Sequence, residues 1–100
     1  MAEFTARAGC EDRVAELVGR LADQVRAEPG NVVFDPFTRT ERGREYVVVE
    51  AYRDDAAFQR HLNSVHSRTF NAELAELIEG AGSDLTWLTP VRPAIHPTER

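Results

Sequence analysis

The chain begins with an alternation of polar and apolar positions and then changes to a helical period. Over residues 3–8, Phe4 and two alanines alternate with polar side chains, which is typical of a strand with one buried face. An apolar stripe follows at positions i, i+3, i+4, i+7 and i+11, formed by Val14, Leu17, Val18, Leu21 and Val25. This spacing predicts an amphipathic helix from about Glu11 to Ala27.

The string Glu28-Pro29-Gly30 ends this helix. Pro29 cannot donate to the helical ladder, and we expect Gly30 to adopt the positive φ that a sharp exit needs. A strand rich in β-branched and aromatic residues starts at Asn31. Within it, Pro36 removes one ladder donor, so we expect this strand at an edge of its sheet or with a bulge.

A hairpin loop at residues 40–43 leads into residues 45–52, the most regular strand pattern in the chain. Its two faces differ. One face is wholly apolar and consists of Val47, Val49 and Ala51. The other is amphipathic and consists of Tyr46, Val48, Glu50 and Tyr52. We expect the amphipathic face to be left open by the chain's own helices and covered by a second subunit. A monomer with a sufficiently polar open face is the alternative.

The second half of the chain predicts two consecutive helical pieces and a last strand. Asp54 or Asp55 can cap a helix whose inner stripe is Phe58, Leu62 and Val65. The stripe changes phase at residues 64–67, which predicts a bend. A second stripe then follows, formed by Phe70, Leu74, Leu77 and Ile78. The final strand spans residues 85–88, and prolines beyond it make residues 91–100 a tail or an arm.

The order strand, helix, strand, strand, helix, strand is a split βαβ pair. It predicts an α+β fold of ferredoxin-like βαββαβ topology with an antiparallel sheet. A length of 100 residues leaves room for one hydrophobic core only. We therefore expect a single domain over residues 1–90.

The composition limits the kinds of partner that we expect the chain to bind. The net charge of −5 provides no basic surface for phosphates, so nucleic acid is not expected. No apolar run approaches the roughly 20 residues that span a bilayer, and the first residues do not resemble a signal peptide. We expect no membrane partner and a cytoplasmic location. Cys10 is the only cysteine, which excludes an intrachain disulfide and a site built on several cysteines.

Two histidines in the bent region are the first candidates for chemistry, because imidazole titrates near neutral pH. His66 lies four residues before Phe70 and should point inward, either as a general base in an apolar pocket or as a tie across the bend. His61 is expected at the mouth of such a pocket or in solvent. Five residues apart on a continuous helix, the two rings would diverge by roughly 140°, so no metal site is predicted.

Glu50 is the third candidate, because a carboxylate on a central strand needs a partner. That partner is either across a dimer interface or a histidine that Glu50 orients. Aromatic residues belong either to the core or to the walls of a substrate pocket, and those considered are Phe4, Tyr52, Phe70 and Trp87. Dinucleotide, phosphate-loop and Cys/His ligand motifs are absent from the sequence, so no bound cofactor is expected.

Three sequence segments, taken together in their order along the chain, resemble the antibiotic biosynthesis monooxygenase family. They are Glu28–Gly30, Val49–Asp54, and His61–His66 followed by Phe70 and Asn71. The likeness extends over about Phe4 to Leu88, and it implies a homodimeric α+β barrel of two ferredoxin-like units. Such families include cofactor-free oxygenases, haem-degrading enzymes and an isomerase. Haem degradation is disfavoured, because strand one lacks the asparagine that haem-degrading members have there. His61 also occupies the position at which those members have tryptophan. At Tyr52 many relatives have tryptophan instead.

The leading hypothesis from this resemblance is a cofactor-independent monooxygenase that uses O₂ to oxidise a hydroxylated aromatic substrate, a quinol or a polyketide-like compound, to a quinone. His66 would be the base, oriented by Glu50 or assisted by His61. Tyr52, Phe70, Trp87 and Phe4 would contact the substrate. The alternative is a non-redox role, either an isomerase of a small metabolite or a dimeric ligand-binding protein without turnover.

Overall fold

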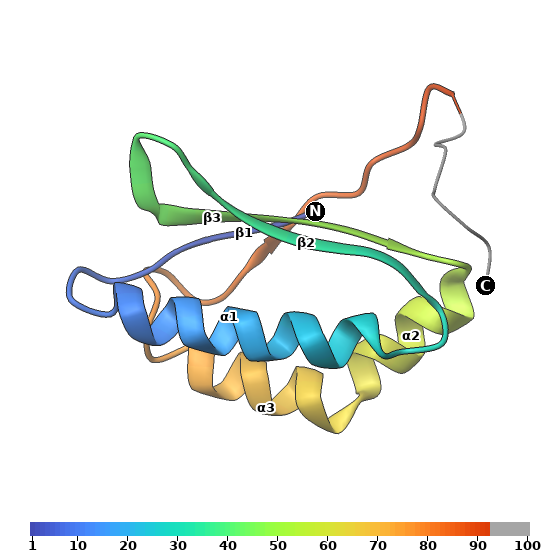
Figure 1. The fold of residues 1–100 in the computed structure, drawn as a ribbon, viewed down its shortest axis with the longest axis horizontal. Coiled ribbons are helices and arrows are strands. Elements are labelled where there is room, and N and C mark those ends of the chain that lie inside the picture. Colours follow the sequence, from blue (N-terminus) through green and yellow to red (C-terminus); the bar gives the residue numbers. More distant parts are fainter. Residues whose placement is uncertain (93–100) are drawn as a thin grey trace.

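A computed structural model describes residues 1–92 of the chain. In chain order the elements are β1 (Ala2–Thr5), α1 (Glu11–Arg26), β2 (Asn31–Arg39), β3 (Arg42–Tyr52), α2 (Asp55–Asn63), α3 (Val65–Leu74) and β4 (Asp84–Leu85). The sheet has the order β2-β3-β1-β4 and all its pairs are antiparallel. This is the predicted ferredoxin-like α+β fold, with β2 at an edge and β3 in the interior of the sheet. The three helices cover one face only (Figure 1).

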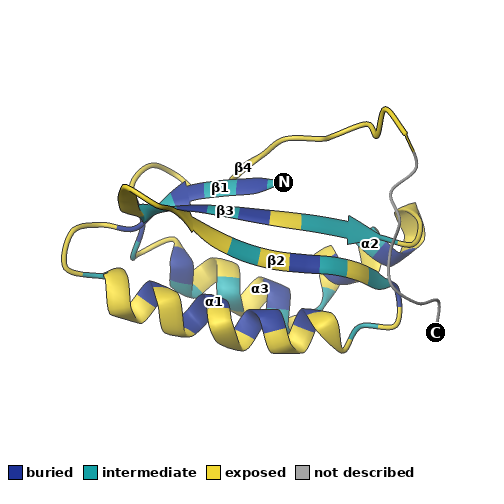
Figure 2. Cartoon of the chain, turned by 45° about the horizontal axis from the view of Figure 1, so that its top comes forward, coloured by how far each residue is buried: buried dark blue, intermediate teal, exposed yellow. Residues whose placement is uncertain are grey.

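The core lies between α1, α3 and the helix-facing side of the sheet. The stripe that predicted α1 is buried along its whole length, and its residues are among the dark blue bands on this helix in Figure 2. The largest side chains with almost no exposed surface are Leu74, Ile78, Val14 and Val25. Ile78 follows α3 and forms an isolated bridge with Ala6, which ties the end of the helical layer to β1.

The expectation about the two faces of β3 is wrong. Tyr46 and Val48 are buried under the helices, and the apolar face with Val49 is the open one. The reason is the register with β1, which pairs Phe4 with Tyr46 and Ala2 with Val48. The rings of Phe4 and Tyr46 stack at a centroid distance of 5.1 Å, so the face of β3 with Tyr46 is part of the core. The pattern within β3 alone could not show that β1 places Phe4 beside Tyr46.

The bend between the predicted helical pieces is a break at Ser64, which has extended backbone with ψ 152°. Its hydroxyl oxygen accepts from the backbone N–H of Ser67 and caps α3, as the Asp54 carboxylate caps α2. The predicted inner stripe of α2 is only partly right: Phe58 is half-buried, whereas Leu62 is 37% and Val65 is 79% exposed. The buried positions of α2 are Ala57 and His61, which lie four residues apart on one face of the helix.

Gly30 is needed for a reason other than the one predicted. Positive φ occurs at Gly9, Gly80 and Gly82 among the described glycines, and Gly30 is not one of them. A Cβ at Gly30 would lie 2.2 Å from the Cβ of Ala57. Gly30 therefore allows the chain after α1 to pass directly against the first turn of α2.

The last strand is shorter than predicted, because pairing with β1 is limited to Asp84 and Leu85. The backbone N–H of Thr86 still donates to the carbonyl of Met1. Trp87 is 73% exposed, so it does not belong to the core. Beyond it the chain turns away from the sheet (Figure 1). Most of the predicted tail, residues 93–100, lies outside the described residues.

Candidate functional site

A cavity of about 290 Å³ lies between the sheet and the helices. Its walls are mainly apolar and include Phe4, Phe34, Val48, Phe58 and Phe70. Five of the lining residues have polar side chains: Glu50, His61, Ser67, Asn71 and Ser83. An apolar cavity with a few convergent polar groups has the general character of a small-molecule site.

His61 is the histidine of this cavity. It extends from α2, is 6% exposed, and its ring lies 5.0 Å from that of Tyr52 by centroids. The Nδ1 atom is 3.0 Å from Oε2 of Glu28, and the Nε2 atom is 3.8 Å from Oε1 of Glu50. The imidazole is therefore flanked by two carboxylates, one at each nitrogen.

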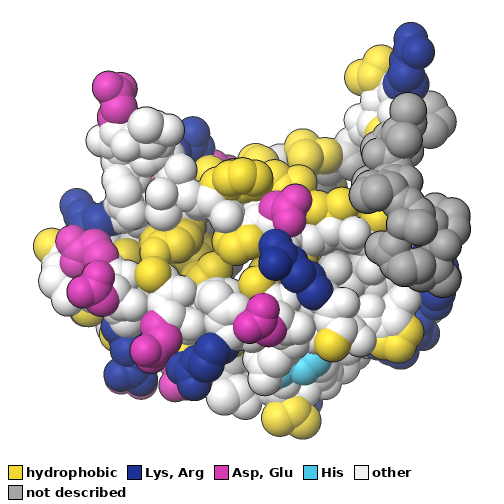
Figure 3. Space-filling model, viewed as in Figure 1, with side chains coloured by type: hydrophobic (Ala, Val, Ile, Leu, Met, Phe, Trp, Pro, Cys, Tyr) yellow, Lys and Arg dark blue, Asp and Glu magenta, His cyan; other side chains and the backbone are white. Residues whose placement is uncertain are grey.

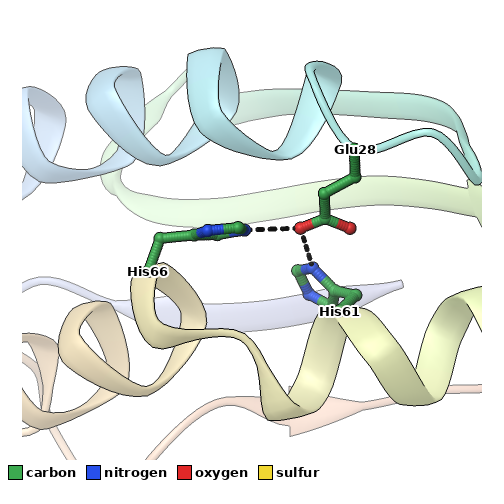
Figure 4. A group of neighbouring side chains, drawn as sticks. All are labelled: Glu28, His61 and His66. Atoms are coloured by element: carbon green, nitrogen blue, oxygen red, sulfur yellow. Dashed lines mark hydrogen bonds and ion pairs between the residues drawn. The ribbon is translucent and has the colours of Figure 1, made fainter.

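Glu28 is a site residue that the sequence motifs did not reveal. It follows α1, its side chain is 14% exposed, and Oε2 accepts from ring nitrogens of both His61 and His66 (Figure 4). These partners lie 33 and 38 residues further along the chain, so no local pattern links them to Glu28. Glu28 begins the Glu-Pro-Gly string, which indicated the end of a helix and contributed to the family resemblance, but which gave Glu28 no role in a site.

His66 lies further out than expected. It stands in the first turn of α3, and its Nε2 atom is 2.5 Å from Oε2 of Glu28. Its side chain is 23% exposed, against 8% for His61. It lines a surface groove between α1 and α3 and is absent from the cavity wall. The two histidines thus have the reverse of the predicted order of burial.

Glu50 finds its partner within the chain. The Tyr52 hydroxyl donates to Oε1 of Glu50 over 2.8 Å. Burial, followed by the charge of Glu50, raises the pKa of Tyr52 well above its usual value. Tyr52 therefore stays protonated and remains a donor at all ordinary pH values. The carboxylate of Glu50 is held between this hydroxyl and the His61 ring.

A second hollow of about 480 Å³ adjoins the first at Glu50, Phe58 and Leu85. Tyr52 and Trp87 line it, and the Trp87 ring meets Phe58 edge to face at 5.0 Å. The aromatic residues considered from sequence thus divide into two groups. Phe4 and Phe70 line the inner cavity, whereas Tyr52 and Trp87 line the outer hollow.

The same centre contains a set of metal-ligating groups. One ligand atom each of Glu28, His61 and His66 lies within 4.8 Å of the others. The absence of a metal site was predicted from the roughly 140° separation of the two rings on a continuous helix, although a bend was expected between them. The break at Ser64 creates the cluster by changing the direction of the chain between the two histidines.

The sequence matches the antibiotic biosynthesis monooxygenase family over residues 1–73. The chain belongs to this family. The carboxylates and histidines that contact one another here all fall within the matched region: Glu28, Glu50, His61 and His66. A candidate monooxygenase of Bacillus subtilis (strain 168), YcnE, is 33% identical over 58 residues. That match covers 58% of the chain and 61% of YcnE, so it spans less than two thirds of the relative.

Solved structures agree with the family fold. Rv0793 from Mycobacterium tuberculosis superposes with a TM-score of 0.86 at 28% identity, over 94% of each chain. A candidate antibiotic biosynthesis monooxygenase from Bacteroides thetaiotaomicron VPI-5482 has a TM-score of 0.85 at 18% identity, over 97% of this chain and 91% of its own. The latter likeness concerns the fold alone. Within residues 1–92, no helix is long and apolar enough to cross a membrane.

Proposed function

We propose that this family member is a monooxygenase that oxidises a hydroxylated aromatic compound, a quinol or a polyketide-like phenol, to a quinone with O₂ and without a bound cofactor. Family membership supports the reaction class. The apolar, aromatic walls and the volume of about 290 Å³ favour a substrate of a few fused rings, near the lower end of ligand pockets. The observation that carries the proposal is the setting of His61 between Glu28 and Glu50.

The first step is removal of a phenolic proton by His61. A neutral imidazole has one N–H, and donation from Nδ1 to Glu28 leaves the lone pair on Nε2, the nitrogen nearer to Glu50. Nε2 is then the base. The imidazolium formed lies between two carboxylates, which stabilise its charge in a mostly buried setting. The Tyr52 hydroxyl keeps Glu50 in place through this step.

The substrate and O₂ carry out the remaining steps. The phenolate gives one electron to O₂, and the resulting radical pair combines to form a carbon–oxygen bond. The peroxide carbon then loses its remaining hydrogen as a proton while the O–O bond breaks. One oxygen atom stays as the quinone carbonyl, and the other leaves as hydroxide and takes up a proton to become water. His61 returns its proton in this last step, so the balance needs no external reductant.

The other candidate residues have supporting roles in this proposal. Phe4 and Phe70 form walls of the inner cavity, and Trp87 and Tyr52 line the adjoining hollow through which a substrate would enter. His66, the base favoured by the sequence, becomes the second donor that holds the Glu28 carboxylate in position.

A homodimer is the second part of the proposal. The open face of the sheet is apolar along β3 and β2, where Val49 and Phe37 are 37% and 55% exposed. Hydrophobic side chains gather on this side between the β2–β3 hairpin and the segment after β4 (Figure 3). An apolar surface of this kind is typical of an interface. A second copy of the chain, docked sheet to sheet, would bury it.

Oxygen uptake with a panel of quinols and anthrones tests the reaction. We expect uptake well above the uncatalysed rate, and a loss of about 100-fold or more in His61→Ala, the usual range for a general base. Gln59→Ala is the matched control, because Gln59 is exposed on the same helix. Uptake at the uncatalysed rate with every substrate would contradict the proposal. Turnover under argon would instead favour an isomerase, and ligand affinity without any turnover would favour a binding protein.

A further inference from the structure

Three ligand atoms from separate parts of the chain converge on one point beside the inner cavity. They are Oε2 of Glu28 after α1, Nδ1 of His61 on α2 and Nε2 of His66 on α3, and all lie within 4.8 Å of one another (Figure 4). We propose that these three side chains form a binding site for a divalent transition-metal ion of the Zn²⁺ class. This inference goes beyond the proposed function and does not depend on it.

The donor set selects this class of ion. Imidazole nitrogen with carboxylate oxygen suits Zn²⁺ and its first-row neighbours better than Mg²⁺ or Ca²⁺, which prefer oxygen ligands alone. Around a tetrahedral ion at about 2.1 Å, ligand atoms lie roughly 3.4 Å apart. The two nitrogens of this cluster are now 3.0 Å and 2.5 Å from Oε2. The three ligand atoms lie within 4.8 Å of one another, so shifts on the order of 1 Å in the carboxylate and the two rings would admit the ion.

The charge of the surroundings also favours a cation. The side chains of Glu28 and Glu50 are only 14% and 13% exposed. Within residues 1–92, neither carboxylate has an ion pair with lysine or arginine, and their only basic partners are the two histidines. Mostly buried carboxylates need a compensating charge, which a divalent ion would provide.

The outer contacts of His61 match those of a metal ligand. Metal-binding histidines usually present their second ring nitrogen to a carboxylate or a carbonyl, which fixes the ring orientation. Here Nε2 of His61 faces Oε1 of Glu50 at 3.8 Å, and the Tyr52 hydroxyl donates to the same oxygen. The support for a ligand is thus present before any ion binds.

The groove at His66 supplies a path to solvent. It runs between α1 and α3 and is lined by Arg20, Gln24 and Thr69 among others. Three protein ligands leave at least one coordination position, which water can occupy from this side. An ion on Nδ1 of His61 would move the ring proton to Nε2 and prevent that nitrogen from acting as a base. Metal binding and the proposed proton abstraction are therefore alternative uses of the same ring.

Binding is measured without substrate on tag-free protein that has been treated with chelator and exchanged into metal-free buffer. Zn²⁺ is titrated by equilibrium dialysis, and Co²⁺ is titrated by its visible absorption. We expect one ion per chain. His66→Ala should lose saturable binding, and because His66 is partly exposed this variant should keep the fold. Glu50→Gln should weaken binding by about 10–100-fold, as loss of an outer partner does. Glu73→Gln, a change in the same groove, should bind as the parent does.

Two results would overturn the inference. One is the absence of saturable binding to the parent protein. The other is equal binding by the parent and by His66→Ala, which would place the ion elsewhere on the chain. Because neither measurement involves turnover, a failure here leaves the oxygenase proposal standing. Equally, an inactive protein that binds one ion through these residues would support the site alone.

Discussion

Replacement of Gly30 by alanine tests the packing that places Glu28 against the two histidines. The added Cβ would lie 2.2 Å from the Cβ of Ala57, and real Cβ atoms essentially never approach within 3.0 Å. The two backbones must therefore separate by at least about 0.8 Å. Ala57 is 3% exposed and belongs to the capped first turn of α2, so neither side has a flexible group that can yield. Overpacking of this kind costs about 1–3 kcal/mol.

The assay is urea unfolding at one fixed protein concentration, because the stability of an oligomer depends on it. Gly30→Ala should lower the free energy of unfolding by about 1–3 kcal/mol. Gly19→Ala is the control. Gly19 lies in α1, and a Cβ added there would have no atom within 4 Å outside its own helix and chain neighbours, so alanine should stabilise the helix by up to about 1 kcal/mol.

A double-mutant cycle isolates the contact. In Gly30→Ala with Ala57→Gly, the nearest remaining atom is the Cα of residue 57 at 3.4 Å, which is an ordinary contact. The two changes should therefore be less damaging together than their separate effects predict, by about 1 kcal/mol or more. Strict additivity, or a Gly30→Ala protein as stable as the parent, would refute the steric explanation.

Three further outcomes follow from the same structure. Val49→Glu puts a charge on the open apolar face and should shift the proposed homodimer to monomers in sedimentation velocity, whereas an unchanged dimer would contradict the sheet-to-sheet arrangement. Leu74→Ala removes a fully buried side chain and should cost about 2–5 kcal/mol in urea unfolding, and a cost below about 1 kcal/mol would argue against this core. The raised pKa of Tyr52 means that above about pH 10 the unfolded tyrosine ionises while the folded one keeps its proton, so stability falls with pH. That alkaline loss should be smaller in Tyr52→Phe, as measured by urea midpoints near about pH 8 and pH 11, and equal losses would contradict it.

The fold could be predicted because its elements carry local periods. The α1 stripe and the alternation in β3 determine their own structures, and Pro36 was sufficient to place β2 at an edge. The face of β3 that would be covered was not predictable in this way. It depends on the register with β1, which places Phe4 on Tyr46, and the residues of β3 themselves do not determine that register.

The site was predicted in part. Glu50 and His61 were recognised from residue type and position, but their order of importance depended on how α2 and α3 meet. A capped break at Ser64 turns Val65 outward and brings His61 and His66 to the same carboxylate. Glu28 could not be found from spacing, because it reaches them from the end of α1 across a contact that only Gly30 permits.

The central claim is that the chain transfers one atom of O₂ to a hydroxylated aromatic, with His61 as the base. The most direct measurement is turnover of an anthrone under ¹⁸O₂ by metal-free protein, followed by mass spectrometry of the quinone. We expect one labelled oxygen in each product molecule, and product formation that falls to the uncatalysed level in His61→Ala. Unlabelled product, or equal rates for the parent and His61→Ala, would contradict this claim.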